Sequence, residues 1–266
     1  GYMFGQYKRL VNRFEGVLTG KGLSYGGLQG RTEATGYGIV FFANAMLEAN
    51  GEKLAGKEVA VSGFGNVAWG TVAKLNELGA KVITISGPDG YIYDPNGVSG
   101  EKVDYMLELR ASGKNICSPY AEKFEGSEFV PGKKPWEVKA DLYIPCATQN
   151  EILIEDAQAI VANGCKFVCE GSNMSSTNEA IKYLQDNGVI VGPSKAANAG
   201  GVACSALEMS QNSMRLSWTF EEVDAKLKDI MTNIYKNSAE AAKEYGCEGN
   251  ILAGANIAGF IKVADA

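Results

Sequence analysis

Hydrophobic and polar positions follow two different periods along the chain. Short apolar or β-branched runs that end near a glycine or a proline predict buried strands. These predicted strands cover 57–63, 81–87, 141–145, 166–169 and 189–191. Apolar residues at helical spacing predict helices over 32–50, 66–78, 100–112, 154–163, 177–187, 201–212 and 220–245. Strands that alternate with helices of this length indicate βαβ units and a parallel sheet.

The pattern predicts an α/β fold: a Rossmann-type, doubly wound, mostly parallel sheet with flanking helices and a C-terminal helical extension. We expect a hinge or domain remnant over 1–30, a dinucleotide-binding domain over 31–215, and C-terminal helices over 216–266. The chain opens on Gly1, and its last segment, GANIAGFIKVADA, predicts a helix without a C-terminal cap. We therefore expect it to be a fragment of a longer polypeptide.

A glycine-rich loop joins the first of these strands to its helix. It has the sequence Gly63-Phe64-Gly65-Asn66-Val67-Ala68. In a G-x-G-x-x-A loop the first glycine permits a tight turn, the second lets the backbone approach a pyrophosphate, and the alanine allows close helix–strand packing. The helix N-terminus then offers unpaired N–H groups to the phosphates. Because the loop follows a strand and opens a helix, it favours dinucleotide binding over a purely structural turn.

The end of the second strand should contact the adenosine ribose. It has the sequence Ser86-Gly87-Pro88-Asp89. A carboxylate here would bind the ribose hydroxyls of NAD and repel the 2′-phosphate of NADP. Asp89 could equally be a turn residue, since Pro-Asp-Gly is a strong turn sequence. With no arginine beside it in the sequence, the residues favour NAD over NADP.

Composition narrows the class of protein. The 266 residues are 45% hydrophobic and 21% charged, with a net charge of −6 and no basic block, so neither a nucleic-acid nor a membrane partner is favoured. The six cysteines contain no C-x-x-C pair, which indicates free buried thiols in a reducing, cytoplasmic compartment and no metal site. Because the chain has no histidine, it contains no Ser-His or Cys-His triad.

Several longer motifs resemble a known family. They are VLTGKGLSYGG, RTEATGYG, VSGFGNVAWG, PCATQNE, EGSNM, SKAANAGG and GANIAGF. Together they resemble glutamate dehydrogenases of the hexameric small-subunit type, within the Glu/Leu/Phe/Val dehydrogenases. The resemblance implies NAD- or NADP-dependent oxidative deamination of L-glutamate to 2-oxoglutarate and ammonia, or the reverse, in a homohexamer.

The resemblance also assigns positions. On the cofactor side it implies Arg31 and Thr35 near the nicotinamide carboxamide, and further contacts from Ala147, Thr148, Gln149, Asn173 and Asn198. By residue type, Thr35 could equally be a helix N-cap and Asn173 a turn residue. On the substrate side it implies Thr19, Val202 and Ser205, although a serine on a helix can also bond its own backbone. It places the catalytic residues before Gly1, so none is assigned in this chain.

Two alternatives stay open. A branched-chain or aromatic amino-acid dehydrogenase shares the fold and chemistry, but polar Thr19 and Ser205 would be left unpaired by an apolar substrate. The second alternative is a nucleotide-binding module without activity of its own. We expect the isolated chain to bind NADH without oxidising glutamate.

Overall fold

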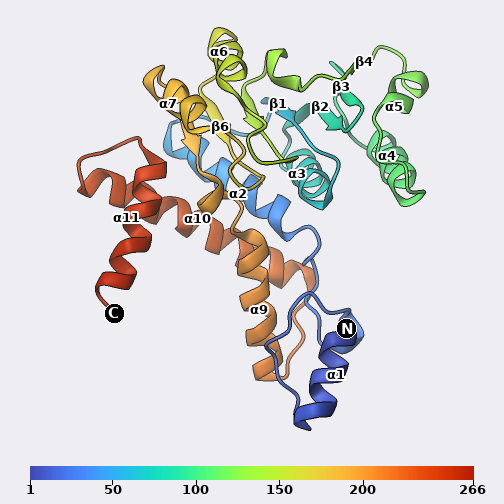
Figure 1. Cartoon of the computed structure of the whole chain (residues 1–266), viewed down its shortest axis with the longest axis vertical. Coiled ribbons are helices and arrows are strands. Elements are labelled where there is room, and N and C mark those ends of the chain that lie inside the picture. Colours follow the sequence, from blue (N-terminus) through green and yellow to red (C-terminus); the bar gives the residue numbers. More distant parts are fainter.

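The computed structural model describes residues 1–266, and a seven-stranded sheet lies at its centre (Figure 1). Its strands are β1 (Glu58–Val61), β2 (Lys81–Gly87), β3 (Gly90–Tyr93), β4 (Glu128–Pro131), β5 (Leu142–Ile144), β6 (Phe167–Cys169) and β7 (Ile190–Gly192). The strand order is β4-β3-β2-β1-β5-β6-β7. Strands β1, β2, β5, β6 and β7 are parallel, whereas β3 and β4 add an antiparallel edge. The predicted doubly wound, mostly parallel sheet is confirmed.

The antiparallel edge is the part of the sheet that the sequence pattern does not predict. Strands β3 and β4 have four residues each, and turn sequences surround β3. Between them lie two helices, α4 (Glu101–Ala111) and α5 (Ser118–Lys123), and these form the arm on the right of Figure 1. Strands this short have little periodicity of their own, and they form by pairing, β3 with β2 and β4 with β3.

Alternating side chains build a separate core on each face of the sheet. Val59 and Val61 of β1 join the core that α2 (Ala34–Ala49), α3 (Asn66–Glu77) and α10 (Phe220–Glu244) cover. Ala60 joins the opposite core, which is covered by the 3-10 helix η2 (Pro135–Glu137), α6 (Ile154–Ala162) and α7 (Asn178–Asp186). Side chains of α10 are part of the first core, so this predicted C-terminal helix belongs to the layer that covers that face of the sheet.

The two covering layers fix where a ligand site can form. The connection from β1 through α3 to β2 runs over one face, and the connection from β5 through α6 to β6 runs over the other. Because β1 and β5 are neighbours, the chain leaves them in opposite directions along the sheet. Such a switch point opens a crevice beyond the carboxyl ends of these two strands.

The first 30 residues extend below the sheet in Figure 1. Helix α1 (Tyr2–Val11) and the 3-10 helix η1 (Leu23–Tyr25) lie beside α9 (Gly200–Met214). A buried ion pair joins the two parts, with Lys21 Nζ 2.7 Å from Glu208 Oε1.

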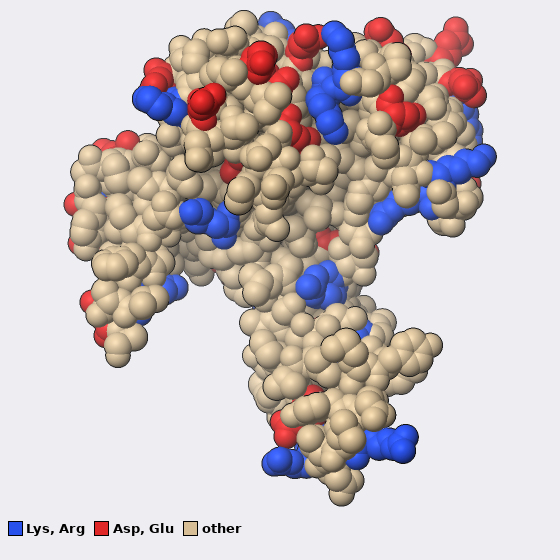
Figure 2. All heavy atoms as spheres, viewed as in Figure 1, with Lys and Arg blue, Asp and Glu red and all other residues tan.

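Two further helices complete the fold, and the last of them packs closely on α10. Helix α8 (Ser194–Ala197) follows β7, and α11 (Ile251–Ala264) packs on α10. At Gly254 a Cβ would stand 1.9 Å from the Ser238 carbonyl oxygen, so only glycine allows this approach. None of the helices combines the length and hydrophobicity that crossing a membrane requires. On the face in Figure 2, charged side chains gather mainly over the upper, sheet-containing part.

Candidate functional site

Two hollows meet at the carboxyl edge of the sheet, where the switch point opens. One has a volume of about 530 Å³ and lies over the glycine loop and the end of β2. The other has a volume of about 610 Å³ and lies between the N-termini of α2 and α9. They share Val67, Cys146 and Ala147, so they form one continuous crevice above β1 and β5.

The glycine loop has the backbone that the sequence predicts. Gly63 has a φ of +97°, and a Cβ on it would stand 2.6 Å from the Cys146 carbonyl oxygen. Its N–H donates to Ser86 Oγ at 2.8 Å, so the end of β2 fixes the turn. Gly65 is the N-cap of α3 and has no side-chain cap, and a Cβ on it would meet nothing within 4 Å. The open space at Gly65 thus faces N–H groups that no side chain satisfies.

The remaining loop residues have structural and lining roles. Ala68 is fully buried in the core. Phe64 lines the first hollow and packs edge-on against Trp69, whose indole N–H donates to the Phe64 carbonyl at 3.1 Å. Asn66 lines the same hollow and accepts a hydrogen bond from Arg110 Nη2 at 2.6 Å. Gly87 follows Ser86 at its rim.

Two cations line this hollow that the sequence pattern does not predict. Arg110 comes from α4 and Lys134 from the loop after β4, and neither forms an ion pair. Both belong to the arm that is inserted between β2 and β5. No arginine stands beside Asp89 in the sequence, but α4 brings Arg110 to the end of β2 from more than 20 residues further along the chain.

Asp89 follows the end of β2 as expected, but its carboxylate points to the start of α5. Its carboxylate oxygens accept hydrogen bonds from Cys117 N at 2.9 and 3.0 Å and from Ser118 N at 3.0 Å, at the start of α5. It is absent from the residues that line the hollow. The turn-residue alternative therefore describes Asp89 in this structure, and its proposed role in selecting NAD loses its basis.

The second hollow contains most of the residues that the resemblance assigns. Arg31, Thr35, Val202 and Ser205 all line it. Thr35 is not a helix cap, since Glu33 holds the N-cap position of α2, and the Thr35 hydroxyl has no hydrogen bond within the chain. Ser205 Oγ accepts from Arg31 Nε at 3.3 Å and donates to the Gly201 carbonyl at 3.2 Å. Ser205 therefore makes both the backbone bond of its helix and a contact with the guanidinium.

Asparagines from two neighbouring loops meet in the same hollow. Asn198 Nδ2 donates to Asn173 Oδ1 at 2.7 Å and to the Gly171 carbonyl at 3.3 Å. Ala147 lines both hollows and Thr148 lines the first. Besides Ala68 and Asp89, two predicted residues line neither hollow: Thr19, in the exposed loop after α1, and Gln149, which is exposed to solvent.

Two buried carboxylates lie beneath these loops, and the sequence analysis misses both. Glu151 accepts hydrogen bonds from the loops after β1 and β5, and its burial raises the pKa of its carboxyl group. Glu170 accepts from Ser176 N at 2.8 Å and Ser194 N at 3.0 Å, and so joins the loops after β6 and β7. Both stand in quoted motifs, PCATQNE and EGSNM, but nothing in a motif shows which side chains turn inward.

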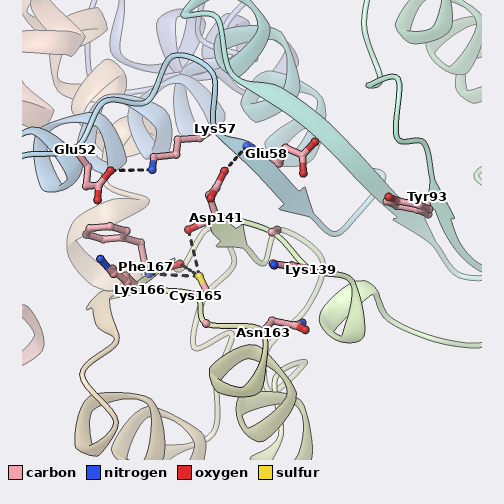
Figure 3. A pocket seen from close by; sticks show the side chains of 12 residues that line it. Glu52, Lys57, Glu58, Tyr93, Lys139, Asp141, Asn163, Cys165, Lys166 and Phe167 are labelled. Carbon is pink, nitrogen blue, oxygen red and sulfur yellow. Dashed lines mark hydrogen bonds and ion pairs between the residues drawn. The ribbon is translucent and has the colours of Figure 1, made fainter.

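A third hollow, of about 590 Å³, lies at the opposite, amino edge of the sheet (Figure 3). Its charged groups largely bond within the protein: Lys57 pairs with Glu52 at 2.8 Å, and Asp141 accepts from Glu58 N at 2.8 Å. Cys165 lies at its base, where burial raises the pKa of the thiol to about 12. This hollow contains none of the sequence-predicted site residues.

Comparison with known proteins agrees with this geometry. The family model for Glutamate/Leucine/Phenylalanine/Valine dehydrogenase matches residues 26–266. The chain is 58% identical over 266 residues to an NAD-specific glutamate dehydrogenase of Bacteroides fragilis (strain YCH46), covering 100% of this chain and 60% of that protein. It is 51% identical to an NADP-specific glutamate dehydrogenase of Haemophilus influenzae, covering 100% of this chain and 59% of that protein.

A solved glutamate dehydrogenase structure superimposes on the whole chain with a TM-score of 0.96 and 56% sequence identity. The chain covers 60% of that structure, and it spans about the same share of the curated relatives. The matched residues include the glycine loop, both hollows of the carboxyl edge and the C-terminal helices. The chain belongs to the Glutamate/Leucine/Phenylalanine/Valine dehydrogenase family.

Proposed function

We propose that the crevice at the carboxyl edge binds a nicotinamide dinucleotide, NAD(H) or NADP(H). The observation that supports this most is the loop at the N-terminus of α3, where Gly65 leaves open space in front of uncapped N–H groups. The helix dipole and these N–H groups favour a pyrophosphate. Arg110 and Lys134 add positive charge beside it. The adenosine half would lie over Ser86 and Gly87.

The nicotinamide half would lie in the second hollow. The Thr35 hydroxyl, which is free of protein partners, and the Asn173–Asn198 pair supply donors and acceptors for a carboxamide. When bound, the nicotinamide supplies a position that accepts or donates a hydride. The residues of this chain bind and orient it, and the walls of the crevice exclude water from one side.

We propose that the reaction is the reversible oxidative deamination of L-glutamate to 2-oxoglutarate and ammonia. The relatives named above support it, because they are called glutamate dehydrogenases. The structure adds Arg31, whose guanidinium reaches Ser205 and forms no ion pair with the protein. A free guanidinium and a hydroxyl in one hollow suit a substrate carboxylate and not an apolar side chain, which disfavours a branched-chain or aromatic substrate.

Proton transfer would need a group from outside these 266 residues. No Lys, Asp or Glu lines the second hollow. We therefore propose that the chain by itself binds cofactor but does not turn over glutamate, and that the complete enzyme is a homohexamer.

Cofactor selectivity is a separate proposal. Asp89 is bonded to the start of α5, whereas Arg110 and Lys134 line the hollow. We propose that the chain accepts both cofactors, with NAD preferred only weakly.

Fluorescence titration of the chain with NADH and then NADPH tests these proposals. We expect saturable binding of both and, in a separate assay, no measurable NADH production from glutamate and NAD. Absence of binding by either cofactor would refute the cofactor site. Turnover at a rate comparable to an intact dehydrogenase would refute the need for an outside proton-transfer group.

A further inference from the structure

Glu151 stands between β5 and α6, beneath the floor of the crevice, and is 7% exposed. Its Oε2 accepts a hydrogen bond from Ser62 Oγ at 2.7 Å. Its Oε1 accepts from the backbone N–H groups of Ala147 at 2.9 Å and Thr148 at 3.3 Å. A single carboxylate therefore joins the loop after β1 to the loop after β5, across the switch point.

Ser62 extends this arrangement by one residue. Its Oγ accepts a hydrogen bond from Cys146 N at 2.9 Å while it donates to Glu151. Three consecutive backbone amides, those of residues 146–148, thus donate hydrogen bonds to Ser62 and Glu151. Because these N–H groups all turn inward, the path of the chain at Cys146 and Ala147, which line both hollows, is fixed from below.

The carboxylate has this position without a paired cation. Glu151 forms no ion pair. Burial raises the pKa of its carboxyl group and is the largest influence on it, whereas the hydrogen bonds and the Lys134 charge lower that pKa. A buried carboxylate without a counter-ion opposes folding unless its hydrogen bonds compensate. Bonds from N–H groups to a charged acceptor are stronger and more directional than neutral ones. The hydrogen bonds that offset the desolvation of the Glu151 carboxylate are therefore the same ones that hold the loop after β5 in place.

We propose that Glu151 is a positioning residue for cofactor binding: through Ser62 and the amides of residues 146–148, it holds the wall where the nicotinamide half of the dinucleotide would lie. The inference rests on the proposed cofactor site and adds a specific prediction. Glu151 should matter more for the nicotinamide half than for the adenosine half. Its carboxylate also accepts from Ser172 Oγ at 3.4 Å, and Ser172 lines only the second hollow. Ser86 and Gly87, over which the adenosine half would lie, have no contact with the carboxylate.

The test compares NADH with ADP, which lacks the nicotinamide half, on the same variants. Glu151→Ala removes the acceptor, and Glu151→Asp keeps the charge but withdraws it by one methylene. Glu151→Gln keeps an oxygen for the two amides and an N–H that can donate to Ser62. The matched control is Glu155→Ala, since Glu155 is exposed on the first turn of α6.

We expect NADH affinity to fall about tenfold or more in Glu151→Ala, because losing the acceptor leaves buried donors unsatisfied. In Glu151→Asp the loss should be smaller, because the carboxylate remains but lies further from its donors. In Glu151→Gln and in the control NADH affinity should stay within about threefold of the unchanged chain, and ADP affinity should stay within about twofold throughout. If Glu151→Ala does not fold, the Asp and Gln variants give the comparison.

Unchanged NADH affinity in a folded Ala or Asp variant would overturn the proposal, and so would an equal loss of NADH and ADP binding, which would indicate general damage. The unchanged chain separates this result from the larger proposal: if it binds neither NADH nor ADP, the cofactor site itself is refuted.

Discussion

The two edges of the sheet contain hollows of similar volume, about 610 Å³ and 590 Å³, but their charges are arranged differently. At the amino edge, three lysines face three carboxylates, and the helices α2 and α6 point their C-termini toward it. At the carboxyl edge, α2, α3 and α9 point their N-termini toward the crevice. There Arg31, Arg110 and Lys134 have no carboxylate partner.

The difference shows why size alone does not locate a binding site. A dinucleotide has two phosphate charges, and it gains from uncompensated cations and from the positive ends of helix dipoles. At the amino edge both contributions are absent, because the lysines are balanced by carboxylates and the helix ends have the opposite sign. The same parallel sheet therefore presents uncompensated positive charge at its carboxyl edge and balanced charge at its amino edge.

The largest expected effect comes from the two glycines of the glycine loop, Gly63 and Gly65. Gly63→Ala should lower the free energy of unfolding by about 2–4 kcal/mol, because a positive φ and a contact at 2.6 Å both penalise a Cβ. Gly65→Ala should leave the melting temperature unchanged, since nothing lies within 4 Å of that Cβ. It should nevertheless weaken NADH binding on the order of 100-fold, about 2.8 kcal/mol, because the methyl group occupies the approach of the pyrophosphate.

Thermal unfolding and NADH titration of both variants separate the two roles. If Gly65→Ala binds NADH as well as the unchanged chain does, the phosphates do not lie at the N-terminus of α3.

A smaller effect should follow from removing one cation at each edge. Arg110→Ala should weaken NADH binding about fivefold at low salt, on the order of 1 kcal/mol, and by less at high salt, because its charge is partly exposed. Lys139→Ala removes the same charge from the amino edge and should have no effect. Titrations at two salt concentrations measure both. Equal losses in the two variants would mean that net charge, and not the placement of charge, controls binding.

Periodicity and local motifs predict most of this molecule. The five parallel strands, the helices that cover them and the glycine loop all follow from patterns within about 20 residues. The β3–β4 edge does not, because its strands have four residues each and depend on pairing, β3 with β2 and β4 with β3. The site shows the same limit: the loop N-terminal to α3 was predictable, whereas Arg110 reaches it only through the folded arm.

The direction in which a loop side chain points is the other property that the sequence does not predict. Asp89 stands where a ribose contact is expected, yet its carboxylate turns to the start of α5. Glu151 stands in a motif noted for Ala147 and Thr148, yet it is the residue that holds them. A short loop can present the same residues inward or outward with little change in pattern, so the hydrogen-bond partners decide the role.

The smallest expected effect lies at the amino edge, in the ion pair between Glu52 and Lys57. The Lys57 ammonium lowers the pKa of the Glu52 carboxyl below its ordinary 4.5, mainly through their hydrogen bond. A carboxyl group whose pKa is lowered by folding stabilises the folded chain above its unfolded pKa and loses that contribution as the pH falls through the lowered value. Glu52→Gln should therefore lower the melting temperature slightly at pH 7 and by progressively less as the pH falls below 4.5, with NADH binding unchanged. Melting curves across this range, with Glu155→Gln as the control for an exposed charge, measure the difference; a decrease that persists at low pH, or a change in NADH affinity, would show that the amino edge is more than a neutralised surface.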